Sequence, residues 1–269
     1  SYPAGVTTNS AEGVLDYDQF YPVLAAMQKH GLVLNLHGEV PSTQPAEYAT
    51  TGDSEPITIL NAEERFLPTL RKIHRDFPDL RIVLEHCTTK AALDTVRELG
   101  PNVVATITAH HLWICLDDAV GSVHNFCKPV AKSPLDRLAL VKAVVDGEGK
   151  FFFGSDSAPH PLSAKIGGLK TVAGCFTQQY ATSLVVSAIQ DAIEKGWIKE
   201  EEVTQEKLEG FLGTYGRKFY KLSEATKSKK ILVEKKGEAI QERLQSPDGQ
   251  VQVVNFKTGD EILSVKWLN

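Results

Sequence analysis

The stretch FFFGSDSAPH, residues 151–160, begins with three aromatic residues, and a glycine, two serines that flank an acid, an alanine, a proline and a histidine follow them. A short, wholly apolar run of this kind is typical of a strand that is buried on both faces of a parallel sheet. A carboxylate at the end of such a strand is costly to bury unless a metal or a cation accompanies it. The stretch therefore predicts a central strand that delivers Asp156 to a functional site.

Three earlier segments repeat this design, because each is an apolar run that ends in histidine. They are LVLNLHGE (32–39) with His37, RIVLEHCTT (81–89) with His86, and VVATITAHHL (103–112) with His110 and His111. We expect 103–112 to be extended throughout, so that His110 and His111 point to opposite faces and at most one faces the interior.

Helical patterns alternate with these strands. Amphipathic helices are predicted over 18–31, where Phe20, Val23, Leu24 and Met27 share a face, and over 61–77, 90–100 and 133–147. A proline- and threonine-rich surface loop is expected over 41–56. Alternating strands and helices indicate a parallel sheet that is covered by helices.

Two architectures fit this alternation, an open doubly wound sheet and a (β/α)8 TIM barrel. The glycine fingerprint of a dinucleotide-binding sheet is absent, whereas functional groups close each strand, as in barrels whose active site lies at the carboxyl ends of the strands. We therefore predict one domain over 1–269 that forms strands 5 to 8 of a barrel, near 32–38, 81–87, 103–110 and 150–156. The earlier strands are expected upstream of Ser1.

The remaining chain is expected to form helices and short strands. Long helices are predicted over 176–196 and over 201–220, the second broken at Gly210 and Gly213. Residues 229–269 read as short strands and turns, so that 200–269 forms a C-terminal extension.

Composition narrows the function classes. The 269 residues carry 29 basic and 34 acidic side chains, a net charge of -5, and this balance gives no basic field for nucleic acid. The sequence contains no run of 18 apolar residues, the length that would predict a membrane helix. The four cysteines are widely spaced, which favours free, buried thiols that act as small apolar residues in a soluble, cytoplasmic protein.

Two histidines and one acid are the candidate metal ligands: His37, His86 and Asp156. A single histidine at a strand end is more often a structural residue. Imidazole and carboxylate together are the donors that suit a catalytic Zn²⁺, which keeps one position for water. Three such groups at three strand ends favour a metal site.

Seven motifs together resemble the monofunctional dihydroorotase family of pyrimidine biosynthesis, within the amidohydrolase superfamily. They are, in order, YPAGVTTNS, LNLHGE, LEHCTT, TAHHL, NFCKPVAK, FFFGSDSAPH and AGCF. The resemblance implies zinc-dependent, reversible cyclisation of N-carbamoyl-L-aspartate to dihydroorotate. It also implies two Zn²⁺ ions bridged by a carboxylated lysine, which, like a His-x-His pair, would lie upstream of Ser1.

The same resemblance implies the role of each matching metal-site residue. His37 and His86 would hold one metal, with His37 also near the substrate. Asp156 would bind the other metal and act as the catalytic base, which passes a proton to the leaving nitrogen.

Five further residues are implied to bind the substrate. His160 and the main chain of Ala173 would hold its carboxylate, the main chain of Lys128 would contact the ring amide, and Thr7 and Thr8 would reach it from a mobile loop. A plainer interpretation of these positions is ordinary turns and loops. A homodimer is compatible with this assignment, and two alternatives stay open: another cyclic amidohydrolase, such as a hydantoinase, or a non-catalytic barrel that serves as a scaffold.

Overall fold

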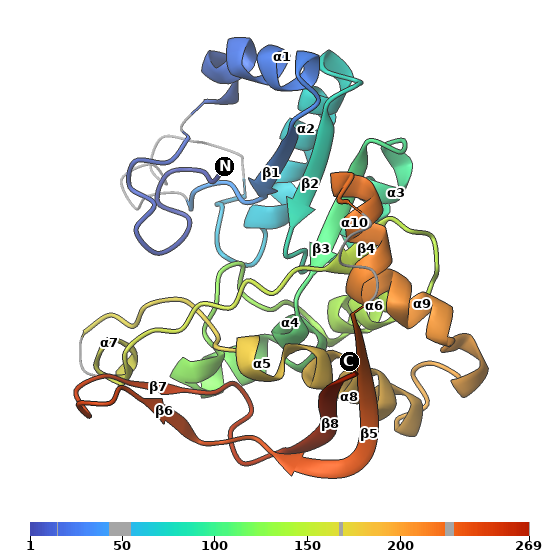
Figure 1. The fold of residues 1–269 in the computed structure, drawn as a ribbon. Helices are drawn as coiled ribbons and strands as arrows, with labels where there is room; N and C mark the ends of the chain where they lie inside the picture. Colours follow the sequence, from blue (N-terminus) through green and yellow to red (C-terminus); the bar gives the residue numbers. More distant parts are fainter. Residues whose placement is uncertain (15, 43–54, 167–168, 224–228, 269) are drawn as a thin grey trace.

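A four-stranded parallel sheet organises the computed structural model, which describes residues 1–14, 16–42, 55–166, 169–223 and 229–268. Its strands lie in the order β1-β2-β3-β4 (Figure 1). Their bounds are Val33–His37, Arg81–Glu85, Val103–Ile107 and Phe151–Phe153. Parallel strands that are neighbours both in the chain and in the sheet are typical of a (β/α)8 barrel. The sheet confirms the four predicted β/α units.

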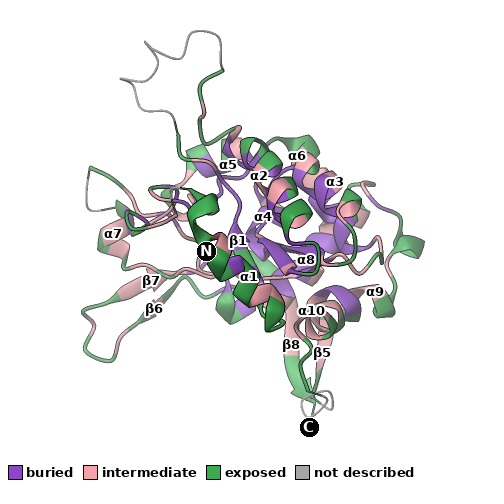
Figure 2. Ribbon diagram, turned by 90° about the horizontal axis from the view of Figure 1, so that it is seen from above, coloured by how far each residue is buried: buried purple, intermediate pink, exposed green. Residues whose placement is uncertain are grey.

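Five main helices share a core with one face of the sheet. They are α1 (Tyr21–Lys29), α2 (Ala62–Asp76), α3 (Lys90–Glu98), α6 (Pro134–Val144) and α8 (Ala181–Glu194). Alternate strand residues such as Leu36, Leu84 and Phe151 point into this core and are almost fully buried. Figure 2 shows the buried interior between the sheet and the exposed outer sides of the helices.

Shorter helices complete the connections: α4 (Ala109–Trp113), α5 (Leu116–Gly121), α7 (Leu162–Ile166), α9 (Gln205–Glu209) and α10 (Tyr215–Tyr220). Short 3₁₀ turns lie at Tyr17–Phe20, Val123–Asn125, Gln178–Tyr180 and Glu200–Glu202.

The opposite face of the sheet changes character along the strands. Val83, Val104 and Phe152 form a small apolar cluster, on which aromatic residues of α10 pack. Side chains at the carboxyl ends of the strands on this face are polar, among them Thr106. A Cβ on Gly154 would lie 2.7 Å from the Cβ of Thr106, so the glycine lets β4 approach β3 closely at this end. The polar end is where the candidate site lies.

The C-terminal region forms two antiparallel pairs. Strand β5 (Lys230–Ala239) pairs with β8 (Glu261–Leu268), and β6 (Arg243–Gln245) pairs with β7 (Gln252–Val254). The first pair lies against α8, where the Leu263 N–H donates to Ser187 Oγ at 3.0 Å. Both β5 and β8 are longer than the short strands that the sequence predicts for this region.

The prediction of a strand over 103–112 is wrong in its second half. Strand β3 ends at Ile107, and the hydroxyl of Thr108 then accepts a hydrogen bond from the His111 N–H and caps α4. A threonine N-cap satisfies one of the free amides of a first helical turn, and here it outweighs the apolar run. His110 and His111 therefore lie on one helical turn and are both buried, instead of pointing to opposite faces of a strand.

Three helix predictions also need correction. Residues 18–31 divide into a 3₁₀ turn and α1, and only Leu24 of the predicted apolar face is buried, because Phe20 and Val23 remain 41% and 52% exposed. Helix α8 starts later than the predicted 176. Gly210–Thr214 is a π-helical turn between α9 and α10 and does not break the helix. The predicted loop over 41–56 falls largely on 43–54, outside the described residues.

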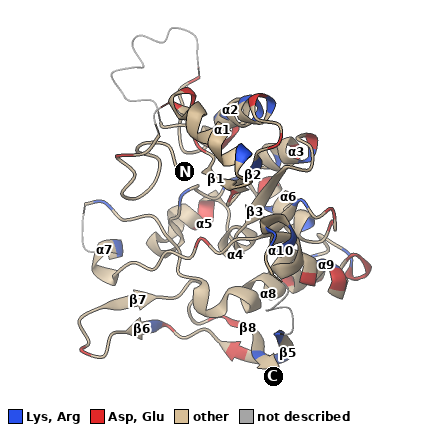
Figure 3. Cartoon of the chain, turned by 45° about the horizontal axis from the view of Figure 1, so that its top comes forward, with Lys and Arg blue, Asp and Glu red and all other residues tan. Residues whose placement is uncertain are grey.

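Charged side chains of both signs lie side by side over the surface, for example on α2 (Figure 3). In the described ranges, the structure contains no helix with the length and apolarity needed to span a bilayer.

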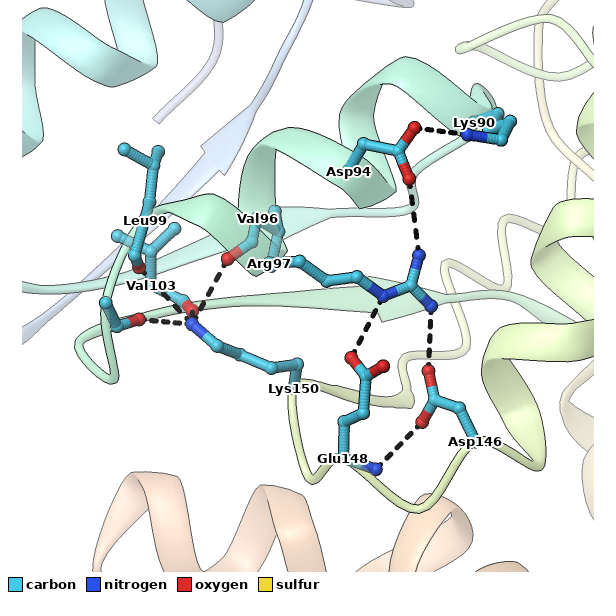
Figure 4. Close-up of polar contacts among 10 residues, drawn as sticks. Lys90, Asp94, Val96, Arg97, Leu99, Val103, Asp146, Glu148 and Lys150 are labelled. Atoms are coloured by element: carbon cyan, nitrogen blue, oxygen red, sulfur yellow. Dashed lines mark hydrogen bonds and ion pairs between the residues drawn. The ribbon is translucent and has the colours of Figure 1, made fainter.

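A polar network joins α3 to the start of β4 (Figure 4). The Lys150 ammonium donates to the carbonyls of Val96 at 3.1 Å and Val103 at 2.9 Å, as well as to those of Leu99 and Gly100. A lysine ammonium that lies near the C-terminus of a helix, as that of Lys150 lies near the end of α3, satisfies carbonyls that the helix leaves unpaired. Arg97 nearby pairs with Asp94, Asp146 and Glu148. The network fixes the entry to β4, and so the position from which Asp156 is presented.

Replacing Lys150 by methionine should lower the free energy of unfolding by about 1–3 kcal/mol, because half-buried carbonyls lose a charged donor while the side-chain volume is nearly kept. Urea titration followed by circular dichroism measures this change. Lys142→Met, on the exposed side of α6, is the matched control and should change stability by less than about 0.5 kcal/mol. Equal effects of both variants would contradict the network's role.

Candidate functional site

A cavity of about 330 Å³ opens at the carboxyl ends of the four strands. Six of the residues singled out in the sequence line it: Thr7, His37, His86, Lys128, Asp156 and Ala173. Glu85 and Thr106, which the sequence did not single out, line it as well. The structure thus gathers all three candidate metal ligands in one cavity.

His37 and His86 lie side by side at the ends of β1 and β2. Their ring centroids are 4.6 Å apart, and both residues are buried. The Nε2 of His37 lies 2.8 Å from Oε2 of the buried Glu39, which leaves Nδ1 as the ring nitrogen available to a ligand. A carboxylate on the second nitrogen is the usual way to orient a histidine that binds a metal.

Two ligand candidates have the left-handed backbone conformation that non-glycine residues rarely adopt. The φ angles are 42° at His86 and 38° at Asp156. Strained residues of this kind persist where surrounding structure holds them, and they concentrate at functional sites. Thr106 provides part of that support, since its hydroxyl accepts the His86 N–H at 2.7 Å and donates to Glu85.

Asp156 lines the cavity and is an exposed residue. Desolvation raises its pKa to about 6, with the neighbouring His37 acting in the opposite direction. Burial likewise lowers the pKa of His86, so this imidazole is neutral and can donate an electron pair.

The donor set fits a metal. Nδ1 of His86 is buried without a hydrogen-bond partner, and no lysine or arginine among the described residues forms a salt bridge with Asp156, whose pKa is lowered by His37 alone. Neutral imidazole and carboxylate around a polar cavity are the donors of catalytic zinc sites.

The residues implied to bind the substrate meet at Ala173. The Ala173 N–H donates to Thr8 Oγ1 at 3.1 Å, and its carbonyl accepts from His160 Nε2 at 3.0 Å. Thr8 and His160 are not among the residues that line the main cavity, and they reach it through Ala173. At Gly174, φ is 150°, and a Cβ would lie 2.6 Å from the Ala158 carbonyl oxygen, so this close approach requires glycine.

Lys165 on α7 is a buried residue that no local sequence pattern singles out. Its ammonium donates to three carbonyls, those of Phe126 at 3.2 Å, Val172 at 3.0 Å and Gly174 at 2.9 Å. These contacts connect the loop that carries Lys128 to the loop that carries Ala173. Isolated lysines in a short helix are common, so only the three-dimensional contacts reveal this one.

Comparison with known proteins identifies the family of the chain. A family model described as Amidohydrolase matches residues 4–213. The dihydroorotase of Saccharomyces cerevisiae is 45% identical over 279 residues, which cover 99% of this chain and 72% of that protein. The chain belongs to the dihydroorotase family of amidohydrolases. Members of this family are metal-dependent hydrolases of cyclic amides.

Solved dihydroorotase structures share the fold. The crystal structure of the Saccharomyces cerevisiae dihydroorotase in complex with 5-fluoroorotic acid matches with a TM-score of 0.88 at 44% identity, over 99% of this chain and 72% of that one. The Campylobacter jejuni dihydroorotase matches with a TM-score of 0.75 at 31% identity, over 98% and 69%. The L-hydantoinase of Arthrobacter aurescens, at 13% identity and a TM-score of 0.70, shares the fold alone.

The chain spans only part of its dihydroorotase relatives. It covers 65% of the probable dihydroorotase of Schizosaccharomyces pombe, with 44% identity, and 40% of the dihydroorotase of Mycosarcoma maydis, with 54% identity.

Replacing Thr106 by valine should destabilise the site, because the His86 N–H loses its acceptor and the Glu85 carboxyl group loses a donor. We expect a loss of about 1–3 kcal/mol in the free energy of unfolding and a lower metal content at a fixed free metal concentration. Thr106→Ser keeps the hydroxyl and should restore both properties. A Thr106→Val protein that bound metal like the unmodified protein would show that the hydroxyl does not support His86.

Proposed function

We propose that the protein is a zinc-dependent dihydroorotase, which interconverts N-carbamoyl-L-aspartate and dihydroorotate in pyrimidine biosynthesis. The observation that carries the proposal is the meeting of His37, His86 and Asp156 in one cavity that Ala173 and Lys128 also line. Candidate metal donors and candidate substrate-binding residues thereby border the same space, as hydrolysis of a cyclic amide with a carboxylate substituent requires.

His37 through Nδ1 and His86 would hold one Zn²⁺, and Asp156 would hold the second. A carboxylated lysine would complete the ligand set. The ions would lower the pKa of a water molecule and polarise the amide carbonyl, which supplies a nucleophile near neutral pH.

In the hydrolytic direction Asp156 would accept the proton of the attacking water and deliver it to the ring nitrogen as the carbon–nitrogen bond breaks. In cyclisation the same carboxylate would take that proton back from the nitrogen. A carboxyl group with a pKa of about 6 exchanges protons near neutral pH more readily than an ordinary aspartate does.

Specificity for a substrate with a carboxylate would come from the loop around Ala173. Main-chain N–H groups near a glycine can approach an anion closely. The Ala173 N–H is occupied by Thr8, so we propose that Thr8 turns from this N–H to the substrate when the substrate binds. The carbonyl contact of His160 would keep the loop in place during this exchange.

A non-catalytic scaffold is the competing function. It would have no use for strained backbone at two candidate ligands, which costs about 1–3 kcal/mol at each residue. The cavity therefore favours catalysis over a scaffold.

Asp156→Asn should lower kcat by at least about a hundredfold in both directions, because the amide cannot accept the proton, whereas it retains an oxygen for weak coordination. Assays of dihydroorotate hydrolysis and of N-carbamoyl-L-aspartate cyclisation, with elemental analysis of the protein, measure the effect. At least one metal per chain should remain. Near-normal turnover with full metal content would make Asp156 a ligand only.

His86→Ala is the contrasting variant for this test, since it should lower metal content and rate together. A fully active enzyme free of metal would refute the proposed function as a whole.

His160→Ala should raise the KM for dihydroorotate about tenfold or more while metal content stays unchanged, because the Ala173 carbonyl loses the donor that holds its loop. Steady-state kinetics with elemental analysis test this expectation. His30→Ala, at the exposed end of α1, is the matched control and should leave both values as they are. Loss of metal from His160→Ala would instead identify His160 as a ligand.

A further inference from the structure

A second group of side chains of the types that bind metals lies apart from the cavity, and it consists of His110, Cys127 and Cys175. His110 belongs to α4, Cys127 precedes Lys128, and Cys175 follows Gly174. One ring nitrogen of His110 and the two sulfurs lie within 4.8 Å of one another. All three residues are at most 1% exposed, and none is among the residues that line the main cavity.

His110 differs sharply from its neighbour in hydrogen bonding. Both of its ring nitrogens are buried without a hydrogen-bond partner. His111, equally buried, has Thr108 Oγ1 2.8 Å from Nδ1 and the Pro129 carbonyl oxygen 3.0 Å from Nε2. A buried polar atom without a partner costs about 1–3 kcal/mol. Two such atoms on one imidazole beside two thiols indicate that a partner belongs in this space.

We propose that His110, Cys127 and Cys175 bind a Zn²⁺ ion that is separate from the catalytic metals. Sulfur and imidazole are donors that zinc prefers, and these three ligands leave the fourth tetrahedral position to another group. Two thiolates balance the charge of the ion, so a neutral unit is buried beside Phe256, whose ring centroid lies 6.3 Å from that of His110. Tetrahedral zinc with two thiolates brings the sulfurs to about 3.8 Å, which requires a contraction of at most about 1 Å.

The position of this site gives it a structural purpose. Cys127 is the residue before Lys128, and Cys175 lies two residues after Ala173. A metal held by both cysteines would join the loop that carries Lys128 to the loop that carries Ala173. Lys165 joins the same two loops through their carbonyls. The ion would add a cross-link to the loops without taking part in the reaction, so the inference goes beyond the proposed function.

Cobalt substitution of the intact protein tests the proposal. The catalytic donor set contains no sulfur, so a thiolate-to-cobalt charge-transfer band in the near ultraviolet reports only the second site. We expect this band in the unmodified protein and its loss in the double variant Cys127→Ser/Cys175→Ser, with one equivalent of zinc fewer by elemental analysis. Cys115→Ser, a buried cysteine elsewhere that contacts Asp118, is the matched control and should keep both band and zinc.

A second measurement needs no variant. After zinc loading, Cys127 and Cys175 should resist alkylation under mild unfolding, as read by mass spectrometry, and a chelator should remove this protection. The proposal is overturned if cobalt gives no charge-transfer band in the unmodified protein, if Cys115→Ser loses the band as fully as the double variant, or if thiol titration shows Cys127 and Cys175 joined in a disulfide. These readouts do not depend on turnover, so they stand or fall separately from the dihydroorotase assignment.

Discussion

The register of the four parallel strands decides where each functional side chain lies. His37 is paired with Glu85 across β1 and β2, and Thr106 is paired with Phe152 across β3 and β4. Alternate residues of each strand enter the core that the helices cover, so the residues between them are held on the opposite face. A shift of one residue in any strand would place an apolar side chain in the cavity and a polar one in the core.

Rigid strands alone do not create the site, because two of the three candidate ligands lie just beyond a strand end. His86 and Asp156 leave β2 and β4 through left-handed backbone, a conformation that regular sheet cannot supply. Thr106 connects these two regions. Its hydroxyl accepts a hydrogen bond from the His86 N–H, and its Cβ lies so close to Gly154 that no larger residue fits at position 154. The strained backbone at the candidate ligands lowers the free energy of unfolding, and the core and networks such as that of Lys150 offset this loss.

Much of this arrangement could be predicted from local sequence, and the failures have a common cause. The apolar runs identify all four strands, and the polar residues at their ends select His37, His86 and Asp156 as candidates, which the structure places in one cavity. The end of β3 was missed because one hydroxyl, on Thr108, turns an apolar run into a helix. Glu39 has a local signal, since it lies two residues after His37 and so on the same side of an extended chain, whereas the contacts of Lys165 come from residues 7 to 39 positions away.

The cysteines show the same limit in another form. Spacing in the sequence correctly indicates free, buried thiols, and all four are free and buried. All three of Cys87, Cys127 and Cys175 contact a main-chain carbonyl, but only Cys127 and Cys175 also lie beside the unpartnered imidazole of His110, a difference that spacing cannot reveal. Chain separations of 17 and 48 residues divide the members of this group, so no local pattern contains it. The loops beside the cavity are therefore positioned by long-range contacts of Lys165 and of this cluster. Thr8, which would have to move if substrate binds at Ala173 as proposed, is attached there by two side-chain hydrogen bonds.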